Sequence, residues 1–369
     1  MAQSGAGSET RRARRRRARR RAPLWSDLLV LGVVGIVLAA ALSAGAVSVY
    51  RTFYGPSAFV TRYLTLLSEG RAADALRLPG VALDTSELDR GSFRTASDAL
   101  LRRAALAPLT DVTVTSERPE QDATAVTVRY RAGGHPGTST FLVHRTGWIG
   151  IAPTWGFAQS PLAVVSVLVR GSDRYFVNGF EIDRRQVAAK GVDAPPLEAV
   201  PLLVFSPGLY AVSVKTAAAT ASGDAVLADK PLAQVPLTVQ TQPTDAFVEV
   251  VQQRVNEFLT QCTTQQVLQP TGCPFGLTVQ NRVTEPPVWS MPTMPTVSLE
   301  PDGAGWKIPP TPATAHVKVE VQSLFDGSVH EFDKDVPFRV DGSIQFLPDG
   351  SASISITSPD QSPDIAPSD

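Results

Sequence analysis

The orientation of the chain follows from residues 11–47, which read RRARRRRARRRAPLWSDLLVLGVVGIVLAAALSAGAV. An arginine run comes first, and an uncharged stretch of twenty apolar or small residues, Leu28 to Val47, follows it. A helix rises about 1.5 Å per residue, so this stretch would span about 30 Å, the thickness of the hydrocarbon core of a bilayer. Because arginine is retained on the cytoplasmic side, we predict one transmembrane helix with the N-terminus inside the cell.

The basic run makes the charge of the chain asymmetric. Residues 1–25 hold nine Arg and one Glu, a charge of +8, so the rest carries −9 to reach the net charge of −1. A tail of this kind suits the anionic inner leaflet, where each Lys or Arg contributes about 1 kcal/mol. A nucleic-acid-binding arm is the rival interpretation, but the apolar stretch that follows favours the membrane, and no basic stripe lies elsewhere. The membrane-surface run comprises Arg11, Arg12, Arg14, Arg15, Arg16, Arg17, Arg19, Arg20 and Arg21.

The apolar stretch has a second interpretation as a cleaved signal peptide. Ala44-Gly45-Ala46 resembles an A-x-A cleavage site, but the apolar region of a signal peptide runs about 7–15 residues and this one is longer. We therefore favour an uncleaved anchor. The prediction is a cytoplasmic tail over 1–25, a transmembrane helix over 26–50, and an extracellular region after it.

The exported region has the length of two or three domains. Arginine outnumbers lysine 28 to 6, and alanine is abundant, so the composition resembles that encoded by GC-rich genomes such as those of actinobacteria. Residues 358–369 are Ser, Pro and Asp with little to bury, and we predict a disordered tail there.

The chain has two cysteines, Cys262 and Cys273, and both lie in the predicted exported region. An even count in an oxidising compartment predicts one disulfide, which would contribute about 2–3 kcal/mol by closing a short loop. A zinc site would need four ligands, and no histidine lies near these thiols. A redox pair would need C-x-x-C spacing, which is absent.

The first exported segment, residues 57–158, begins with helical spacing and ends with strand spacing. We predict helices over 59–67, 71–78 and 97–106. From Val112 to Ile151 the apolar period changes to two, which is typical of strands. Helices followed by an antiparallel meander predict an α+β domain, with the helices packed on one face of a curved sheet.

The second segment, residues 160–240, contains short β signals throughout. Val164 to Val169 is an apolar β-branched run, and Leu202 to Phe205 is another. Asn178-Gly179 is the preferred dipeptide of a type I′ hairpin turn. This spacing predicts a small β-sandwich.

The third segment, residues 244–357, repeats the plan of the first. Asp245 is a suitable N-cap for a helix that ends near Cys262. Hairpin turns are predicted at Asp326-Gly327 and at Asp341-Gly342. The predicted strands cover 297–299, 306–308, 316–324, 329–338 and 344–347.

Two short motifs carry a resemblance to a known family. Phe176-Val177-Asn178-Gly179 and the stretch Leu203 to Tyr210, which reads LVFSPGLY, resemble strand-turn signatures of membrane proteins associated with teicoplanin resistance in Gram-positive bacteria. The flanking segments resemble the nuclear-transport-factor-2-like, or cystatin-like, superfamily of cone-shaped folds. The resemblance implies a cell-envelope function and no catalytic residues. Those proteins begin with a cysteine-rich zinc ribbon, whereas this chain has the arginine run.

The titratable residues do not form a recognisable catalytic pattern. No serine lies in a G-x-S-x-G turn, and the sequence contains neither an H-E-x-x-H helix nor a glycine-rich phosphate loop. We interpret the histidines as solvent-facing or satisfied core residues and assign none of them to catalysis; they are His135, His144, His316 and His330. We therefore predict a protein that is not an enzyme and holds no metal or cofactor.

Three aromatic residues near the end of the first segment invite a ligand-binding interpretation. Trp148, Trp155 and Phe157 would line a pocket if the segment encloses one, since pockets are commonly lined by aromatic side chains. The alternative, which we favour, is that they fill the core.

The sequence thus predicts one transmembrane helix followed by exported α+β domains of cystatin-like fold that flank a small β-sandwich. The leading hypothesis is a non-catalytic, single-pass cell-envelope protein that binds a protein partner or a cell-wall polymer, and no nucleic acid. A carrier of small molecules or lipids is the alternative. An enzyme on the same scaffold ranks third, because fold analogy alone would support it.

Overall fold

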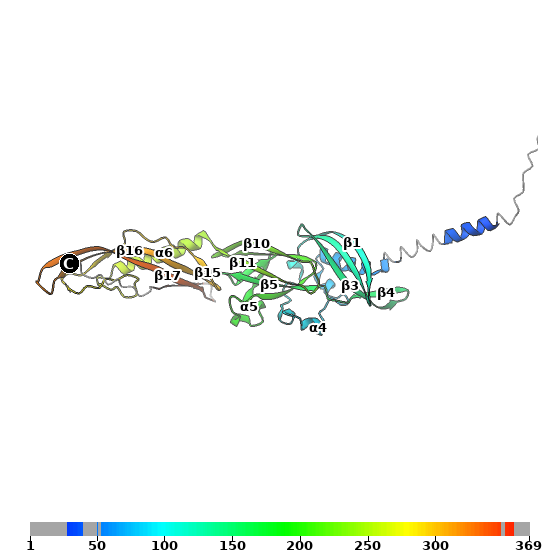
Figure 1. The fold of residues 1–369 in the computed structure, drawn as a ribbon, viewed down its shortest axis with the longest axis horizontal. Helices are drawn as coiled ribbons and strands as arrows, with labels where there is room; N and C mark the ends of the chain where they lie inside the picture. The colour runs from blue at the N-terminus through cyan, green and yellow to red at the C-terminus, as the bar shows by residue number, and fades with distance from the viewer. Residues whose placement is uncertain (1–27, 40–49, 51–52, 348–350, 358–369) are drawn as a thin grey trace, which may run out of the picture. The chain divides into compact units, whose positions relative to one another are not determined.

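The computed structural model describes residues 28–39, 50, 53–347 and 351–357, and it divides into two compact units at Gly55 (Figure 1). In the first unit, residues 28–39 are helical with exposed side chains. Within the described ranges, no helix has both the length and the apolar character needed to cross a membrane. The predicted span continues through residues 40–47, which lie outside the described residues, as do the basic run at 11–21 and the tail at 358–369.

The second unit is rich in β-sheet, and its first part pairs a helix with a sheet. Helix α2 (Pro56–Ser68) buries Val60, Tyr63, Leu64 and Leu67 at helical spacing and contacts all four strands. This arrangement confirms the predicted first helix and the antiparallel meander. The sheet has the order β1-β2-β3-β4, with strands at Leu109–Glu120, Ala123–Ala132, His135–Ile149 and Ala152–Phe157.

Short helical turns follow α2. The predicted second helix is confirmed as α3 (Ala72–Leu76), and the sequence analysis missed α4 (Thr85–Leu88) and η1 (Phe93–Thr95). The predicted helix over 97–106 is wrong, since only η2 (Arg103–Ala105) is helical there. Ser97 instead bonds across to the second part: its N–H donates to the Pro201 carbonyl at 3.0 Å, and its carbonyl accepts from the Leu203 N–H at 2.8 Å.

A buried carboxylate links this region to the second part. Glu87 is 6% exposed and completes a capping box with Asp84 at the start of α4. Its Oε2 accepts from the Asp84 N–H at 3.0 Å, and its Oε1 accepts from the Ser160 N–H at 2.9 Å. The Ser160 hydroxyl donates to the Val81 carbonyl at 2.7 Å. The bonds from Asp84 and Ser160 satisfy both oxygens of a carboxyl group that would otherwise be costly to bury.

A buried tyrosine makes a second link. The Tyr63 hydroxyl on α2 donates to the Ser206 carbonyl at 3.0 Å. Burial raises the pKa of Tyr63 well above its ordinary value, so the hydroxyl remains a donor. The same helix therefore packs on its own sheet and bonds to the backbone of the second part.

The second part contains two sheets, as expected for a β-sandwich. One has the order β12-β10-β9-β6-β7 and the other β11-β5-β8, with β11 and β5 parallel. The predicted hairpin turn is confirmed, because Asn178 and Gly179 have φ of 50° and 86° between β6 and β7. The elements are β5 (Leu162–Arg170), β6 (Arg174–Val177), β7 (Phe180–Asp183), α5 (Arg184–Val187), η3 (Gly191–Asp193), β8 (Val200–Phe205), β9 (Gly208–Lys215), β10 (Ala219–Ala228), β11 (Gln234–Gln240) and β12 (Gln242–Pro243).

The buried side chains form two apolar clusters that cross the predicted segment boundaries. One cluster joins Leu162 and Phe205 of the second part to the core of the first. The other joins Val165 and Leu202 of the second part to Phe247 and other residues of the third. The division into domains at 57–158, 160–240 and 244–357 therefore stays a prediction.

The third part begins with helix α6 (Asp245–Thr263), which confirms the predicted helix. Its N-cap is Thr244 and not the predicted Asp245, because the Thr244 hydroxyl accepts from the Phe247 N–H at 3.3 Å. Asp245 lies in the first turn, where a negative charge interacts favourably with the helix dipole. The helix buries Phe247, Val251, Val255, Leu259 and Cys262.

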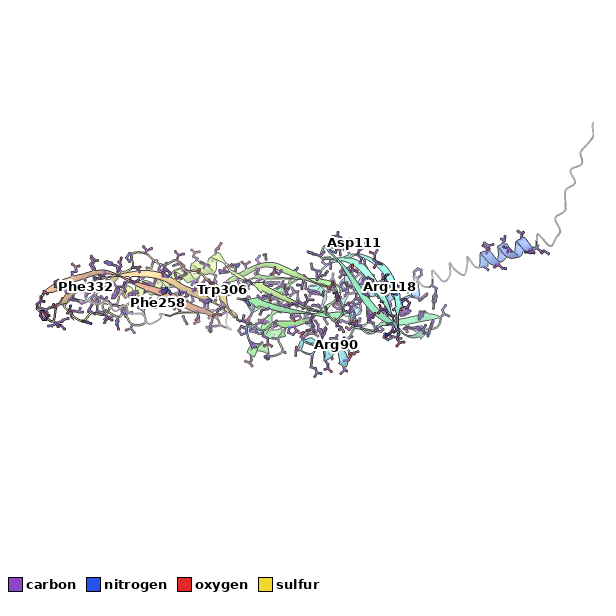
Figure 2. All side chains as sticks on the ribbon, viewed as in Figure 1. Arg90, Asp111, Arg118, Phe258, Trp306 and Phe332 are labelled. Carbon is purple, nitrogen blue, oxygen red and sulfur yellow. A yellow bond between two sulfur atoms is a disulfide. The ribbon has the colours of Figure 1, made fainter. Side chains whose placement is uncertain are left out.

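Two long strands, β16 (Gly305–Gln322) and β17 (Val329–Phe346), pair along most of their length (Figure 2 labels Trp306 in β16). Strand β18 (Ala352–Thr357) pairs with β17, and the sequence analysis missed it. The short strands β13 (Arg282–Val283), β14 (Val288–Ser290) and β15 (Glu300–Asp302) pair with β16. The strand predicted over 297–299 is wrong, because the only strand near it is β15.

The predicted turn at Asp341-Gly342 is also wrong. Gly342 lies inside β17, opposite Ile308 of β16 and Ile356 of β18. A Cβ atom at Gly342 would lie 2.7 Å from the Ser355 carbonyl oxygen, so the glycine permits close approach of β18. The turn at Asp326-Gly327, by contrast, is confirmed between β16 and β17.

The predicted disulfide is confirmed: Cys262, in the last turn of α6, is bonded to Cys273, with a Cα–Cα distance of 5.8 Å. The Gln265 side chain supports the enclosed loop. Its Oε1 accepts from the Thr271 N–H at 2.8 Å.

Breaking this disulfide should destabilise the third part. The bond closes a loop with a sequence separation of 11, for which chain entropy predicts about 3 kcal/mol. Urea unfolding monitored by circular dichroism should give a lower midpoint with reductant than without it. The Cys262→Ser/Cys273→Ser variant should have this lower midpoint whether or not reductant is present. Equal midpoints for the oxidised and reduced protein would contradict the prediction.

Candidate interaction site

Of the three aromatic residues predicted to line a pocket, Trp155 and Phe157 share one apolar cluster and Trp148 lies outside it. Phe157 is buried, and its ring centroid lies 5.0 Å from that of Phe59 and 5.1 Å from that of Tyr63. Trp155 is half-buried against the same cluster, whereas Trp148 is 57% exposed. Phe157 is therefore core filling, as the favoured alternative predicted, and Trp148 lies on the surface.

The four histidines lie apart, each with its own surroundings. Nδ1 of His135 lies 3.3 Å from the Gly133 carbonyl oxygen in an exposed turn. His144 lines an open pocket of about 590 Å³ beside the β1–β2 turn. His316 lies on the outer face of β16, and His330 follows the β16–β17 turn. Among the described residues, no group of three or more His, Cys, Asp or Glu is arranged to hold a metal ion.

The β16–β17 turn presents an exposed apolar pair. Phe325 is 99% exposed and the adjacent Leu324 is 73% exposed. The strand positions beside them are different, because Val321 is 1% exposed and belongs to the core. The apolar tip, Leu324 and Phe325, thus projects directly beyond the packed part of the sheet.

Hydrogen bonds hold the backbone of the tip in one conformation. The Ser323 N–H donates to the Ser328 carbonyl at 2.8 Å, and the Gly327 N–H donates to the Ser323 carbonyl at 3.1 Å. The Ser323 hydroxyl accepts from the N–H of Phe325 at 3.2 Å. Gly327 has a φ of 78°, a left-handed conformation that suits glycine. The tip is therefore a built turn.

Asp326 completes the turn through its carboxylate. Its Oδ1 accepts from the Ser328 hydroxyl at 2.8 Å and from the Ser328 N–H at 3.1 Å. These bonds, with one from Ser323, stabilise the charged form and lower the pKa of Asp326 to about 2. The carboxylate is consequently ionised at neutral pH, directly beside the apolar tip.

Ser328 also contacts His330, with 2.9 Å between the hydroxyl oxygen and Nε2. The order of these three groups differs from that of a nucleophilic triad. In a triad the imidazole lies between the hydroxyl and the carboxylate, whereas here the hydroxyl lies between Asp326 and His330. The arrangement orders the turn and leaves the imidazole without a carboxylate to orient it.

The outer face of the same hairpin carries paired charges. His316 Nδ1 lies 2.8 Å from an oxygen of Asp335, and its Nε2 lies 2.9 Å from an oxygen of Asp333. Lys318 Nζ lies 2.8 Å from the other oxygen of Asp333. The hydrogen bond from Lys318 is the main cause that lowers the pKa of Asp333. Phe332, labelled in Figure 2, lies next to Asp333 in β17 but packs against the apolar cluster.

Comparisons with known proteins add no relative: no family model, no curated protein and no solved structure matches the chain. The resemblance to the teicoplanin-resistance-associated membrane proteins therefore stays a prediction. What the chain does must be argued from its own residues.

The exposed tip is not among the residues predicted from the sequence. The predicted strand ends at Leu324 and the predicted turn is Asp326-Gly327, so Phe325 lies between the two. The sequence nevertheless carries a signal for the tip. Successive residues of a strand point to opposite faces of the sheet, so two consecutive apolar residues directly before an Asp-Gly turn cannot both face the core.

Removing the Ser328 hydroxyl should raise the pKa of Asp326. The folded value of about 2 lies below the ordinary value, so the ionised carboxylate stabilises the turn above about pH 4, and this stabilisation is lost as the pH falls towards 2. Carboxyl NMR titration should find an Asp326 pKa near 2 in the wild type and a higher value in Ser328→Ala. The control Ser343→Ala, at an exposed serine of β17, should leave it near 2. A wild-type value close to 4 would refute the assignment.

Proposed function

We propose that the chain is a non-catalytic, single-pass cell-envelope protein whose exported region captures a protein partner through the apolar tip of the β16–β17 hairpin. The observation that carries the proposal is Phe325, which is 99% exposed on a hydrogen-bonded turn. A fully exposed phenylalanine gains free energy only when another surface covers it.

The chemistry of the tip favours a protein partner over a cell-wall polymer. Aromatic residues are enriched in protein–protein interfaces, and an aromatic anchor binds best in an apolar pocket on the partner. The bonds that Ser323 makes order the backbone before binding, which lowers the entropic cost of association. The paired charges of Lys318 and Asp333 on the same hairpin suit a polar rim.

The membrane anchor is part of the proposal. Leu28 to Val47 supply an apolar length equal to a bilayer core, and the basic run supplies the orientation. The described part of this stretch, residues 28–39, is helical with exposed apolar side chains. The disulfide between Cys262 and Cys273 suits an oxidising compartment outside the cytoplasm.

The finer fold assignment also belongs here. We propose that the first and third parts are cystatin-like domains flanking a small β-sandwich, as in the teicoplanin-resistance-associated proteins that the sequence resembles. Support comes from the order of elements, since a helix precedes an antiparallel meander in both flanking parts.

We do not propose the carrier alternative. It needs Trp148, Trp155 and Phe157 to line one cavity, and Phe157 packs in the core while Trp148 is exposed. An enzyme would need convergent titratable groups, and the partners of the histidines described above supply none that we can assign to a reaction.

The proposed topology predicts the outcome of limited proteolysis. A protease added to intact spheroplasts should digest the region after Tyr54, because that region would be outside. A tag placed before Arg11 should stay intact until the membrane is permeabilised. Cleavage of the tag alone in intact spheroplasts would show that the orientation is the opposite of the one proposed.

The apolar tip predicts a site-specific contact with the partner. A photo-crosslinking amino acid at position 325 should give one discrete protein adduct on intact cells, and the same probe at Val192, another exposed apolar residue, should not. Phe325→Asp should weaken capture by about 30-fold, the size expected for a hot spot of about 2 kcal/mol. The control Val192→Asp should bind normally. Capture by Phe325→Asp at wild-type strength would refute the proposed site.

Partner capture and the cellular role together test the assignment of the histidines. Variants in which one histidine is replaced should keep both if they fold: His135→Ala, His144→Ala, His316→Ala and His330→Ala. A folded histidine variant that binds the partner but loses the role would place the enzyme hypothesis first.

A further inference from the structure

A second exposed apolar tip lies on the β3–β4 hairpin. Trp148, Ile149 and Ile151 are 57%, 75% and 82% exposed, and Gly150 makes the turn with a φ of 61°. Trp148 pairs with Pro153, and Ile149 with Ala152, so the hairpin is closed almost to its end. The membrane tip, as we name residues 148–151, is therefore an ordered and exposed apolar surface.

The register of the sheet shows how far the membrane tip projects. The β1–β2 hairpin closes at Glu120 and Ala123, and Thr124 pairs with Val143 of β3. Strand β3 continues for six more residues, from His144 to Ile149, at about 3.3 Å each. The β3–β4 hairpin thus extends about 20 Å beyond the last β2–β3 pair and about 13 Å beyond the β1–β2 turn, whose residues 121–122 lie beside His144.

The hairpin projects from the sheet end at which α2 begins. The Ser57 hydroxyl donates to Glu117 Oε2 at 2.5 Å, and Glu117 lies three residues before the end of β1. Phe59 stacks near Phe157, which is level with the base of the projecting hairpin. Figure 1 shows the start of α2 and the β3–β4 hairpin at the same end of this sheet.

If the proposed anchor is correct, the short connection between the anchor and α2 limits how far this end of the sheet can lie from the bilayer. The apolar stretch ends at Val47, ten residues before Ser57. Ten residues reach at most about 35 Å, so Ser57 must lie within that distance of the membrane surface. A hairpin of about 20 Å that projects from the same end can reach the interface.

We propose that the β3–β4 hairpin inserts the membrane tip into the interface of the leaflet that faces the exported region. This inference rests on the proposed anchor. Tryptophan and isoleucine suit this depth, because the indole ring favours the headgroup level and the aliphatic chains favour the acyl boundary. The anchored chain makes the second contact intramolecular, so a weak apolar contact is sufficient to seat the exported region on the bilayer.

The residues next to the tip fit the headgroup region. The Arg145 guanidinium lies 5.0 Å from the centroid of the Trp148 ring, a cation–π contact that leaves its N–H groups available to lipid phosphates. The acidic residues Glu120 and Asp122 lie at the β1–β2 turn, about 13 Å or more short of the tip, on its water side. Only the apolar end of the hairpin needs to leave water.

The test uses the full chain reconstituted in vesicles of phosphatidylglycerol and phosphatidylcholine. An environment-sensitive fluorophore is attached at Ile151→Cys, with Val192→Cys as the matched control, since both are exposed apolar positions. Brominated lipids should quench the probe at position 151 by about twofold and leave position 192 unchanged, because only the first would lie in the interface. Adding Trp148→Ser and Ile149→Ser should abolish the quenching.

Flotation separates the two proposals. If the chain does not float with the vesicles, the anchor itself is wrong. If it floats but position 151 is not quenched, the anchor stands and the inserted hairpin is refuted. A blue-shifted probe that brominated lipids do not quench would mean that protein covers the tip, for example a second copy of the chain, and would also overturn the inference.

Discussion

Antiparallel pairing beyond the apolar core is the constraint on which the two candidate surfaces depend. The core-facing side chains end near Val143 on β3 and near Val321 on β16, but the backbone ladders of both hairpins continue. Backbone hydrogen bonds between two strands do not need a covered face, so each hairpin can carry side chains past the last buried position. Apolar residues placed there stay exposed, as Ile149 and Phe325 are.

Buried polar bonds join the first part, which carries the β3–β4 hairpin, to the second part. Glu87 accepts from Asp84 and Ser160, and Tyr63 donates to Ser206, so the first and second parts share hydrogen bonds as well as apolar contacts. Arg184 is 5% exposed, and its guanidinium pairs with Asp173 at 2.9 Å. Removing one partner from such a site leaves a buried charge unpaired, which costs several kcal/mol. The bonds of Glu87 and Tyr63 should therefore resist separation of the first and second parts, and the Arg184–Asp173 pair stabilises the second part itself.

The two tips differ in ways that suit different partners. Phe325 lies on a short turn with an ionised aspartate beside it and paired charges on the adjoining strands. The Trp148 tip is apolar from residue 148 to residue 151 and has an arginine stacked on its aromatic ring. An apolar anchor beside a carboxylate favours a protein pocket, whereas an uncharged apolar end with a cation behind it favours lipid headgroups and acyl chains.

The sequence by itself determined the elements that local spacing controls. The helical repeat from Phe247 to Leu259 predicts α6, Asn178-Gly179 predicts the β6–β7 turn, and the even count of two cysteines predicts their disulfide. Tertiary structure decided the rest, because those outcomes depend on residues distant in the chain. Residues 97–106 are not helical since Ser97 bonds across to Pro201 and Leu203. Gly342 is not a turn since β18 packs against it. Alternation marked Ile149 as a strand residue, but whether a core covers it depends on where the neighbouring strands stop, and only the three-dimensional register sets that.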